Sequence, residues 1–190
     1  MPQDPIKTLI NLIQANLLTI TYPTGNPNAG QLIVTKDDGV TSPNVLVTSQ
    51  WFTDTMFETE GEQFDGIVTV TILTDPITPS GFGVEQEDHL ITADINCWAM
   101  NKYAPLPSGA TSGTSTLVIT DEIMRYKLAQ AIDAIINANQ KTQLAYGIEH
   151  MHVHLMLPMD ETPTEAPAPL VRRYRIEVEL FMPTLTSLAQ

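Results

Sequence analysis

HLITADINCWAM, residues 89–100, is the stretch that decides the fold of this chain. Every second residue in it is apolar: Ile91, Ala93, Ile95, Cys97 and Ala99. The residues between them form a more polar set: Thr92, Asp94, Asn96 and Trp98. Successive side chains of a strand point to opposite faces. The alternation therefore predicts a half-buried β-strand with one apolar and one polar face.

Other strands are predicted from runs rich in β-branched residues. They are QLIVT (31–35), NVLVTSQW (44–51), GIVTVTIL (66–73), IEHMHVHLML (148–157) and VRRYRIEVELFM (171–182). The last run alternates like residues 89–100. Its apolar face would carry Tyr174, Ile176, Val178, Leu180 and Met182, and its charged face Arg173, Arg175, Glu177 and Glu179.

Two helices are predicted, one before and one within this series of strands. DPIKTLINLIQANL (4–17) opens with Asp4 as a cap and Pro5 at the first helical position, where a missing N–H costs nothing. Its apolar stripe is Ile6, Leu9, Ile10, Ile13 and Leu17. DEIMRYKLAQAIDAIINANQ (121–140) carries the second stripe, made of Met124, Leu128, Ala131, Ile132, Ile135 and Ile136.

The order of these elements predicts one α+β domain over residues 1–190. Its sheet would be mostly antiparallel, with the two helices packed on one face. Loops rich in Pro, Gly, Asn or small residues are expected to be mobile near 22–30 and 104–116. A proline-rich acidic connector is expected at 158–169.

Composition excludes several classes of function. The chain has 22 acidic and 9 basic residues, a formal charge of −13. Affinity for nucleic acid comes largely from Lys and Arg, so a polyanion-binding surface is not expected. Cys97 is the single cysteine, which rules out an intrachain disulfide. The N-terminus does not read as a signal peptide, and no run approaches the roughly 20 apolar residues of a membrane span. We expect a soluble protein that is intracellular when it is made.

Three of the four histidines, His150, His152 and His154, occupy alternate positions of one predicted strand. Imidazole is a common metal ligand, so a metal site is one interpretation. The other is a solvent-facing or subunit-facing sheet surface. Residues 150 to 154 span roughly 13 Å at about 3.3 Å per residue, which makes convergence of all three on one ion difficult. We therefore expect no metal, although His89 would join the group if its strand paired with this one.

The two faces of this strand were assigned by simple alternation. The core face is expected to carry Met151, Val153, Leu155 and Leu157. The histidine face is expected to carry Ile148 and Met156 as well.

No standard catalytic or cofactor motif occurs in the chain. GxSxG, HExxH, CxxC and the P-loop pattern are all missing, and the GFG at 81–83 does not open a helix. Cys97 falls on the apolar side of its strand, which favours a buried, inert thiol. Arg172, Arg173 and Arg175 either pair with Glu161 and Glu165 or meet an acidic patch of a neighbouring subunit. We expect no catalytic residue and no cofactor.

Several phrases of the sequence together resemble a known family. They are DPIKTLINLIQANL, PNVLVTSQWF, FDGIVTVTIL, EDHLITADINCWAM, DEIMRYKLAQAI and RRYRIEVEL. In order and type they resemble tail-terminator or tail-completion proteins of tailed viruses and proviruses, archaeal ones among them. The connector at 158–169 departs from that pattern.

The resemblance implies a structural protein of the virion, with an α+β sheet flanked by helices. It implies a ring, usually of six copies, that caps the tail tube and joins tail to head. The partners would be other copies of the chain, the tail tube protein and head–tail connector proteins. Viral DNA would pass through the lumen without specific binding, and an acidic ring suits that role.

Three alternatives remain open at this level. The chain could be another head–tail connector or neck protein. It could be a metal-dependent enzyme or binding protein built on the strand of His150, His152 and His154. It could also be a stand-alone binding module.

Overall fold

The computed structural model describes the parts of the chain that form its sheet and helices. They are residues 4–17, 19–21, 31–35, 45–50, 64, 66–79, 86–100, 102–103, 117–119, 121–140, 148–160 and 171–185. The two helices are α1 (Pro5–Asn16) and α3 (Asp121–Ala138). The strands are β1 (Thr19–Thr21), β2 (Gln31–Thr35), β3 (Val45–Thr48), β4 (Gly66–Thr74), β5 (Ile77–Pro79), β6 (Gln86–Met100), β7 (Lys102–Tyr103), β8 (Leu117–Ile119), β9 (His150–Asp160) and β10 (Val171–Leu185).

Eight of these strands form one sheet, in the order β1-β2-β3-β4-β6-β10-β9, with β5 paired to β6. The pairings of β2 with β3 and of β3 with β4 are parallel. The other pairings in the sheet are antiparallel. The predicted α+β fold with a mostly antiparallel sheet is confirmed.

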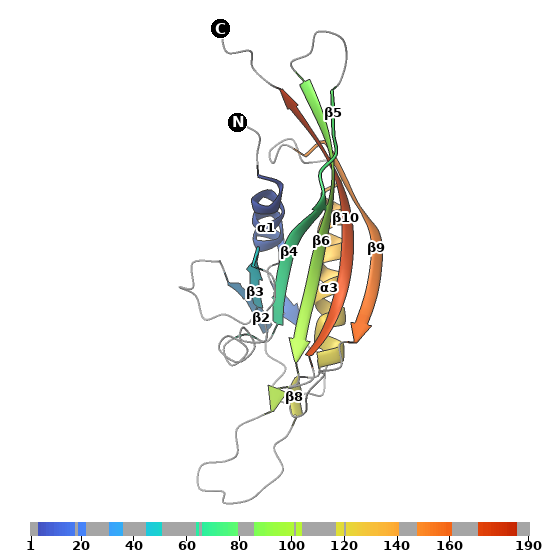
Figure 1. Ribbon diagram of the computed structural model, residues 1–190. Helices are drawn as coiled ribbons and strands as arrows, with labels where there is room; N and C mark the ends of the chain where they lie inside the picture. The colour runs from blue at the N-terminus through green and yellow to red at the C-terminus, as the bar shows by residue number, and fades with distance from the viewer. Residues whose placement is uncertain are drawn as a thin grey trace, which may run out of the picture.

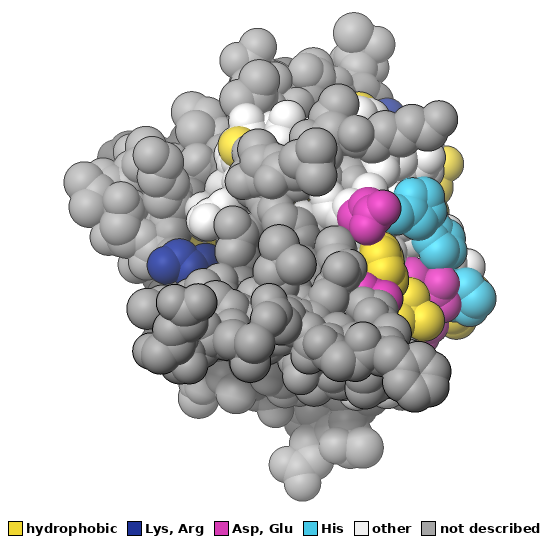
Figure 2. Space-filling model, turned by 90° about the horizontal axis from the view of Figure 1, so that it is seen from above, with side chains coloured by type: hydrophobic (Ala, Val, Ile, Leu, Met, Phe, Trp, Pro, Cys, Tyr) yellow, Lys and Arg dark blue, Asp and Glu magenta, His cyan; other side chains and the backbone are white. Residues whose placement is uncertain are grey.

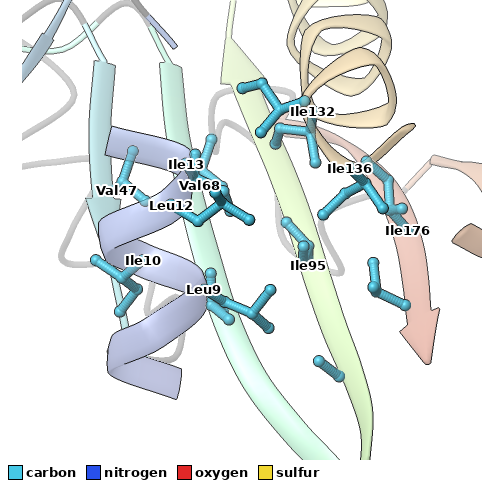
Figure 3. Packing of buried hydrophobic residues seen from close by; sticks show 14 of the residues in the cluster. Leu9, Ile10, Leu12, Ile13, Val47, Val68, Ile95, Ile132, Ile136 and Ile176 are labelled. Atoms are coloured by element: carbon cyan, nitrogen blue, oxygen red, sulfur yellow. The ribbon is translucent and has the colours of Figure 1, made fainter. Parts of the chain in front are cut away.

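Both helices cover the same face of the sheet, as predicted. α1 lies over β3 and β4, and α3 lies over β6, β9 and β10 (Figure 1). One continuous apolar cluster joins the two helices to the sheet. Figure 3 shows Leu12 and Ile13 of α1 near Val68, while Ile132 and Ile136 of α3 point toward the β6–β10 pair.

The first helix begins where the sequence places it. A carboxylate oxygen of Asp4 accepts hydrogen bonds from the backbone N–H groups of Ile6 (2.9 Å) and Lys7 (3.3 Å). Pro5 occupies the first helical position. Because these bonds satisfy donors that no helical carbonyl can reach, Asp4 fixes the start of α1.

The second helix approaches the sheet closely at a glycine. A β-carbon added to Gly66 of β4 would lie 2.7 Å from Leu128 Cδ1 and 2.8 Å from Met124 Cε. The absence of a side chain at Gly66 therefore sets the distance between α3 and β4. At the β9–β10 end, Arg125 donates hydrogen bonds to the carbonyls of Met159 (3.1 Å) and Arg173 (3.2 Å).

The structure corrects some boundaries. Residues 77–79 fall between the predicted strands at 66–73 and 89–100, but they form β5 because they pair with residues 87–89 of β6. Pairing with β5 and with β10 extends β6 back to Gln86, earlier than the apolar alternation begins. The short strands β1, β7 and β8 carry no run long enough to be predicted. The predicted loops at 22–30 and 104–116 lie outside the described residues. Of the connector at 158–169, residues 158–160 belong to β9 and the rest is not described.

No helix in the described part of the chain is long and apolar enough to cross a membrane.

Candidate functional site

The face of the sheet turned away from α1 and α3 gathers most of the polar side chains of the central strands. We call it the second face. Along the three strands β6, β10 and β9 it carries Thr92, Asp94, Asn96, Trp98, Arg173, Arg175, Glu177, Glu179, His152, Leu155 and Leu157. Cross-strand neighbours on this face are set by the antiparallel register, which places Arg175 beside Asn96 and Glu179 beside His152.

The polar side of β6 is buried. The exposed fractions are 3% for Asp94, 0% for Asn96 and 2% for Trp98. The expectation of a half-buried strand is therefore wrong, although the apolar and polar faces are divided as predicted. β6 is flanked on both sides by long strands, and its polar side chains interact with side chains of β4 and β10 as well as with each other.

An ion-pair network holds the centre of the second face. Arg175 Nε donates to Asp94 Oδ1 at 2.9 Å, and its Nη2 lies 2.8 Å from Glu177 Oε1. The hydrogen bond to Asp94 raises the pKa of the Arg175 guanidinium above its usual value. Asn96 donates to the second oxygen of Asp94 at 3.1 Å. The buried carboxylate is thus both paired and hydrogen-bonded, as burial of a charge requires.

Trp98 extends this network toward β4. Its indole N–H donates to the hydroxyl of Thr69 at 3.0 Å, and the guanidinium of Arg173 lies 5.1 Å from its ring centre. The arginines at 172–175 therefore contact the chain itself. Arg175 meets Asp94 and Glu177, and Arg172 lies 4.0 Å from Glu122. The predicted partners Glu161 and Glu165 lie outside the described residues.

A β-bulge in β9 changes which residues face the core. Glu177 of β10 pairs with Leu155 and Val178 with Val153, so His154 is an extra residue without a partner in the register. Before the bulge the odd-numbered residues of β9 face the core, and after it the even-numbered residues do. The prediction is therefore right for Met151 and Val153, which pack in or against the core, and wrong beyond them.

Leu155, Met156 and Leu157 were assigned to the wrong side because of this inversion, whereas Ile148 was misassigned because it lies before the strand begins. Met156 packs against the core, while Leu157 is 42% exposed on the second face. Leu155 lies opposite Glu177, on the second face as well. Ile148, which precedes β9, is 1% exposed and belongs to the core.

Two of the histidines meet a carboxylate that the sequence did not place beside them. His152 Nε2 lies 3.2 Å from Glu179 Oε2, and His154 Nδ1 lies 3.9 Å from Glu179 Oε1. One ligand atom from each of these three residues falls within 4.8 Å of the others. His150 is adjacent, with its ring centre 5.5 Å from that of His152. Figure 2 shows the histidine side chains gathered beside acidic ones at one edge of that view.

His89 does not join this group. β10 lies between β6 and β9, so the strand of His89 does not pair with the histidine strand. His89 Nδ1 lies instead 2.9 Å from a carboxylate oxygen of Asp75. Sequence reasoning missed Glu179 because only the β9–β10 register reveals that it stands opposite His152.

A groove runs between the first half of α3 and the β9–β10 edge. It has a volume of about 590 Å³. Its lining is Glu122, Ile123, Arg125, Tyr126, Lys127, Pro158 and Tyr174. Ile123 (38%) and Tyr126 (48%) are unusually exposed for apolar side chains, and Tyr126 stands 6.3 Å from Tyr174, centre to centre.

Cys97 is fully buried against the helices. Burial raises the pKa of its thiol far above the ordinary value, so it stays protonated. Since the thiolate is the reactive form, Cys97 is an inert core residue, as predicted.

No protein-family model matches the chain, and no curated protein shows significant sequence similarity to it.

Proposed function

We propose that this chain is a structural virion protein that caps a viral tail tube as a ring and joins the tail to the head. One observation carries the proposal. Each phrase on which the resemblance to tail terminators rests coincides with one element of the sheet or its helices, from α1 through β3, β4, β6 and α3 to β10. The likeness therefore lies in the framework of the fold.

The charge distribution supports a ring through which DNA passes. All four arginines of the chain, Arg125, Arg172, Arg173 and Arg175, contact groups of the chain itself. With a formal charge of −13, the protein has few cations to offer to phosphates. DNA would be repelled weakly along the lumen and would not stick to it.

The β9 edge supports contact between copies of the chain. β9 ends the strand order, and no other described strand pairs with its outer edge. The groove of Ile123, Tyr126 and Tyr174 lies at the same end of the sheet. An open edge next to exposed apolar side chains is a typical subunit contact, so we place a neighbouring copy here.

In this role the protein acts by mass action and not by a reaction. A ring binds the last ring of the tube and occupies the surface on which the next tube ring would polymerise. It then offers a new surface to the head. Partners are the tail tube protein and the connector proteins of the head.

Electron microscopy of particles produced without the protein tests the role directly. We expect tubes of uncontrolled length and heads without tails. Particles whose tails have normal length and still join heads would reject the proposal. Tubes of normal length that fail to attach would favour the alternative of a connector or neck protein.

The ring contact has its own test. Tyr126→Glu places a charge in the groove and should shift the protein toward monomers, measured by native mass in the presence of tail tube protein. Ala134→Glu, at an exposed position further along α3 and outside the groove lining, is the matched control and should leave the assembly unchanged. If the Tyr126→Glu variant assembles as well as the parent protein, the interface between copies lies elsewhere.

A further inference from the structure

The cluster of His152, His154 and Glu179 has a chemistry that the proposed function does not use. It contains two imidazoles and one carboxylate from two hydrogen-bonded strands. We propose that these three side chains bind one divalent transition-metal ion, through His152 Nε2, His154 Nδ1 and the Glu179 carboxylate.

The distances fit such an ion. Zinc binds imidazole nitrogen at about 2.0–2.1 Å, which puts neighbouring ligand atoms of a tetrahedral site roughly 3.4 Å apart. His152 Nε2 lies 3.2 Å from Glu179 Oε2, and His154 Nδ1 lies 3.9 Å from the other oxygen, Oε1. One ligand atom from each of the three residues lies within 4.8 Å of the others, so small side-chain rotations would bring the set to the spacing of a metal site. The side chains of His152 and His154 are 40% and 58% exposed, so both have room for the small rotations that close the site.

The backbone holds the ligands in place. Glu179 lies directly opposite His152 in the β9–β10 register. The bulge adds His154 to the same neighbourhood, and bulges commonly re-aim a side chain in this way. Ligands carried by paired strands need little ordering on binding, because the sheet has already fixed their main chains.

A site made of the histidines alone would need three imidazoles along one strand to converge over roughly 13 Å. Glu179 removes that requirement, since two histidines at alternate positions and one cross-strand carboxylate complete a three-ligand set. His150 need not take part.

The donor set selects the class of ion. Imidazole with one carboxylate suits Zn²⁺, Ni²⁺ or Cu²⁺, whereas Ca²⁺ and Mg²⁺ prefer oxygen ligands throughout. Three protein ligands leave a fourth position of a tetrahedral ion open. The side chains of His152, His154 and Glu179 are 40%, 58% and 32% exposed, so water or a group from another molecule can reach that position. The inference does not depend on the proposed tail function.

Titration of zinc chloride into tag-free, chelator-treated protein near neutral pH tests it, with isothermal calorimetry as the readout. We expect one ion per chain. His154→Ala and Glu179→Gln should each weaken binding by at least about tenfold, because each removes a ligand. Affinity should also fall on acidification, since protons compete for the imidazole nitrogens.

Two matched controls make the result specific to these ligands. His89→Ala removes a histidine from the His89–Asp75 pair, which has the same kind of contact but belongs to no three-ligand group among the described residues, and should bind zinc like the parent protein. His150→Ala should do so as well. Circular dichroism of each variant checks that it is folded.

Three outcomes would overturn the proposal. The first is no heat of binding at zinc concentrations well above that of the protein, which leaves Glu179 as a hydrogen-bond partner of the histidines only. The second is undiminished binding by the folded His154→Ala and Glu179→Gln variants. The third is loss of binding in His150→Ala or His89→Ala, which would place the ion on a different ligand set.

Discussion

Ile95 and Asn96 are neighbours in β6 and are both fully buried, yet they are held by different forces. Ile95 lies in the apolar cluster beneath the helices, where burial is favourable without regard to direction. Asn96 lies in the network of Asp94, Arg175 and Arg173, where each polar atom depends on a particular partner. The sheet face beneath the helices should therefore tolerate substitutions that conserve side-chain volume. The second face should instead lose stability when one partner of a polar contact is removed.

The largest expected difference between the faces concerns access to Cys97. Its thiol is buried and protonated, so a thiol reagent should modify it only after unfolding. For a domain of ordinary stability this makes native labelling at least about a thousandfold slower than labelling in denaturant. Absorbance of the released chromophore measures both rates.

An exposed thiol supplies the control for that measurement. The double substitution Cys97→Ala with Leu157→Cys moves the cysteine to a position on the second face that is 42% exposed. It should react at close to the rate of a free thiol. Fast labelling of native Cys97 would contradict its placement beneath the helices.

The apolar face itself is tested at Ile132, which is fully buried at the centre of α3. Ile132→Ala should lower the free energy of unfolding by about 2–5 kcal/mol, through lost burial and the cavity it leaves. Gln130→Ala, on the exposed side of the same helix, should change it by less than about 0.5 kcal/mol. Denaturant titration compares the two, and a reversed ranking would show that α3 presents another face to the sheet.

The polar face is tested at Arg175. Arg175→Met leaves Asp94, whose side chain is 5% exposed, without its cation. Since Arg175 is itself partly exposed, we expect a loss of about 2 kcal/mol in the free energy of unfolding.

A double-mutant cycle separates a broken pair from lost packing. Asp94→Asn combined with Arg175→Met removes both charges, and the combination should cost less than the two single changes added together. Additive costs would mean that the pair contributes no coupling and that packing alone holds this part of the face.

The smallest expected effect tests the inversion at the bulge. Met156→Thr removes a side chain that packs against the core, and should cost about 1 kcal/mol more than Leu157→Thr on the second face. Thermal unfolding of the two variants makes the comparison. Had the strand alternated without a bulge, Leu157→Thr would be the costlier change.

Local patterns in the sequence were enough to predict most of the framework. The cap at Asp4, the stripes of both helices and the alternation of β6 and β10 predicted their positions and the faces they bury. These features depend on residues close together in the chain, where the helical and strand periods fix the direction of each side chain.

Tertiary structure alone decided which side chains are buried on the second face and which of them meet there. The burial of Asp94 and Asn96 depends on neighbouring strands that are distant in sequence. The contact between His152 and Glu179 depends on strand register. Met156 faces the core in place of Leu157 because of one extra residue in an edge strand. A one-residue shift in pairing inverts every side chain beyond it while leaving the composition of the strand untouched. For that reason the sequence determined where the longer strands lie, and the pairing of those strands determined which residues meet.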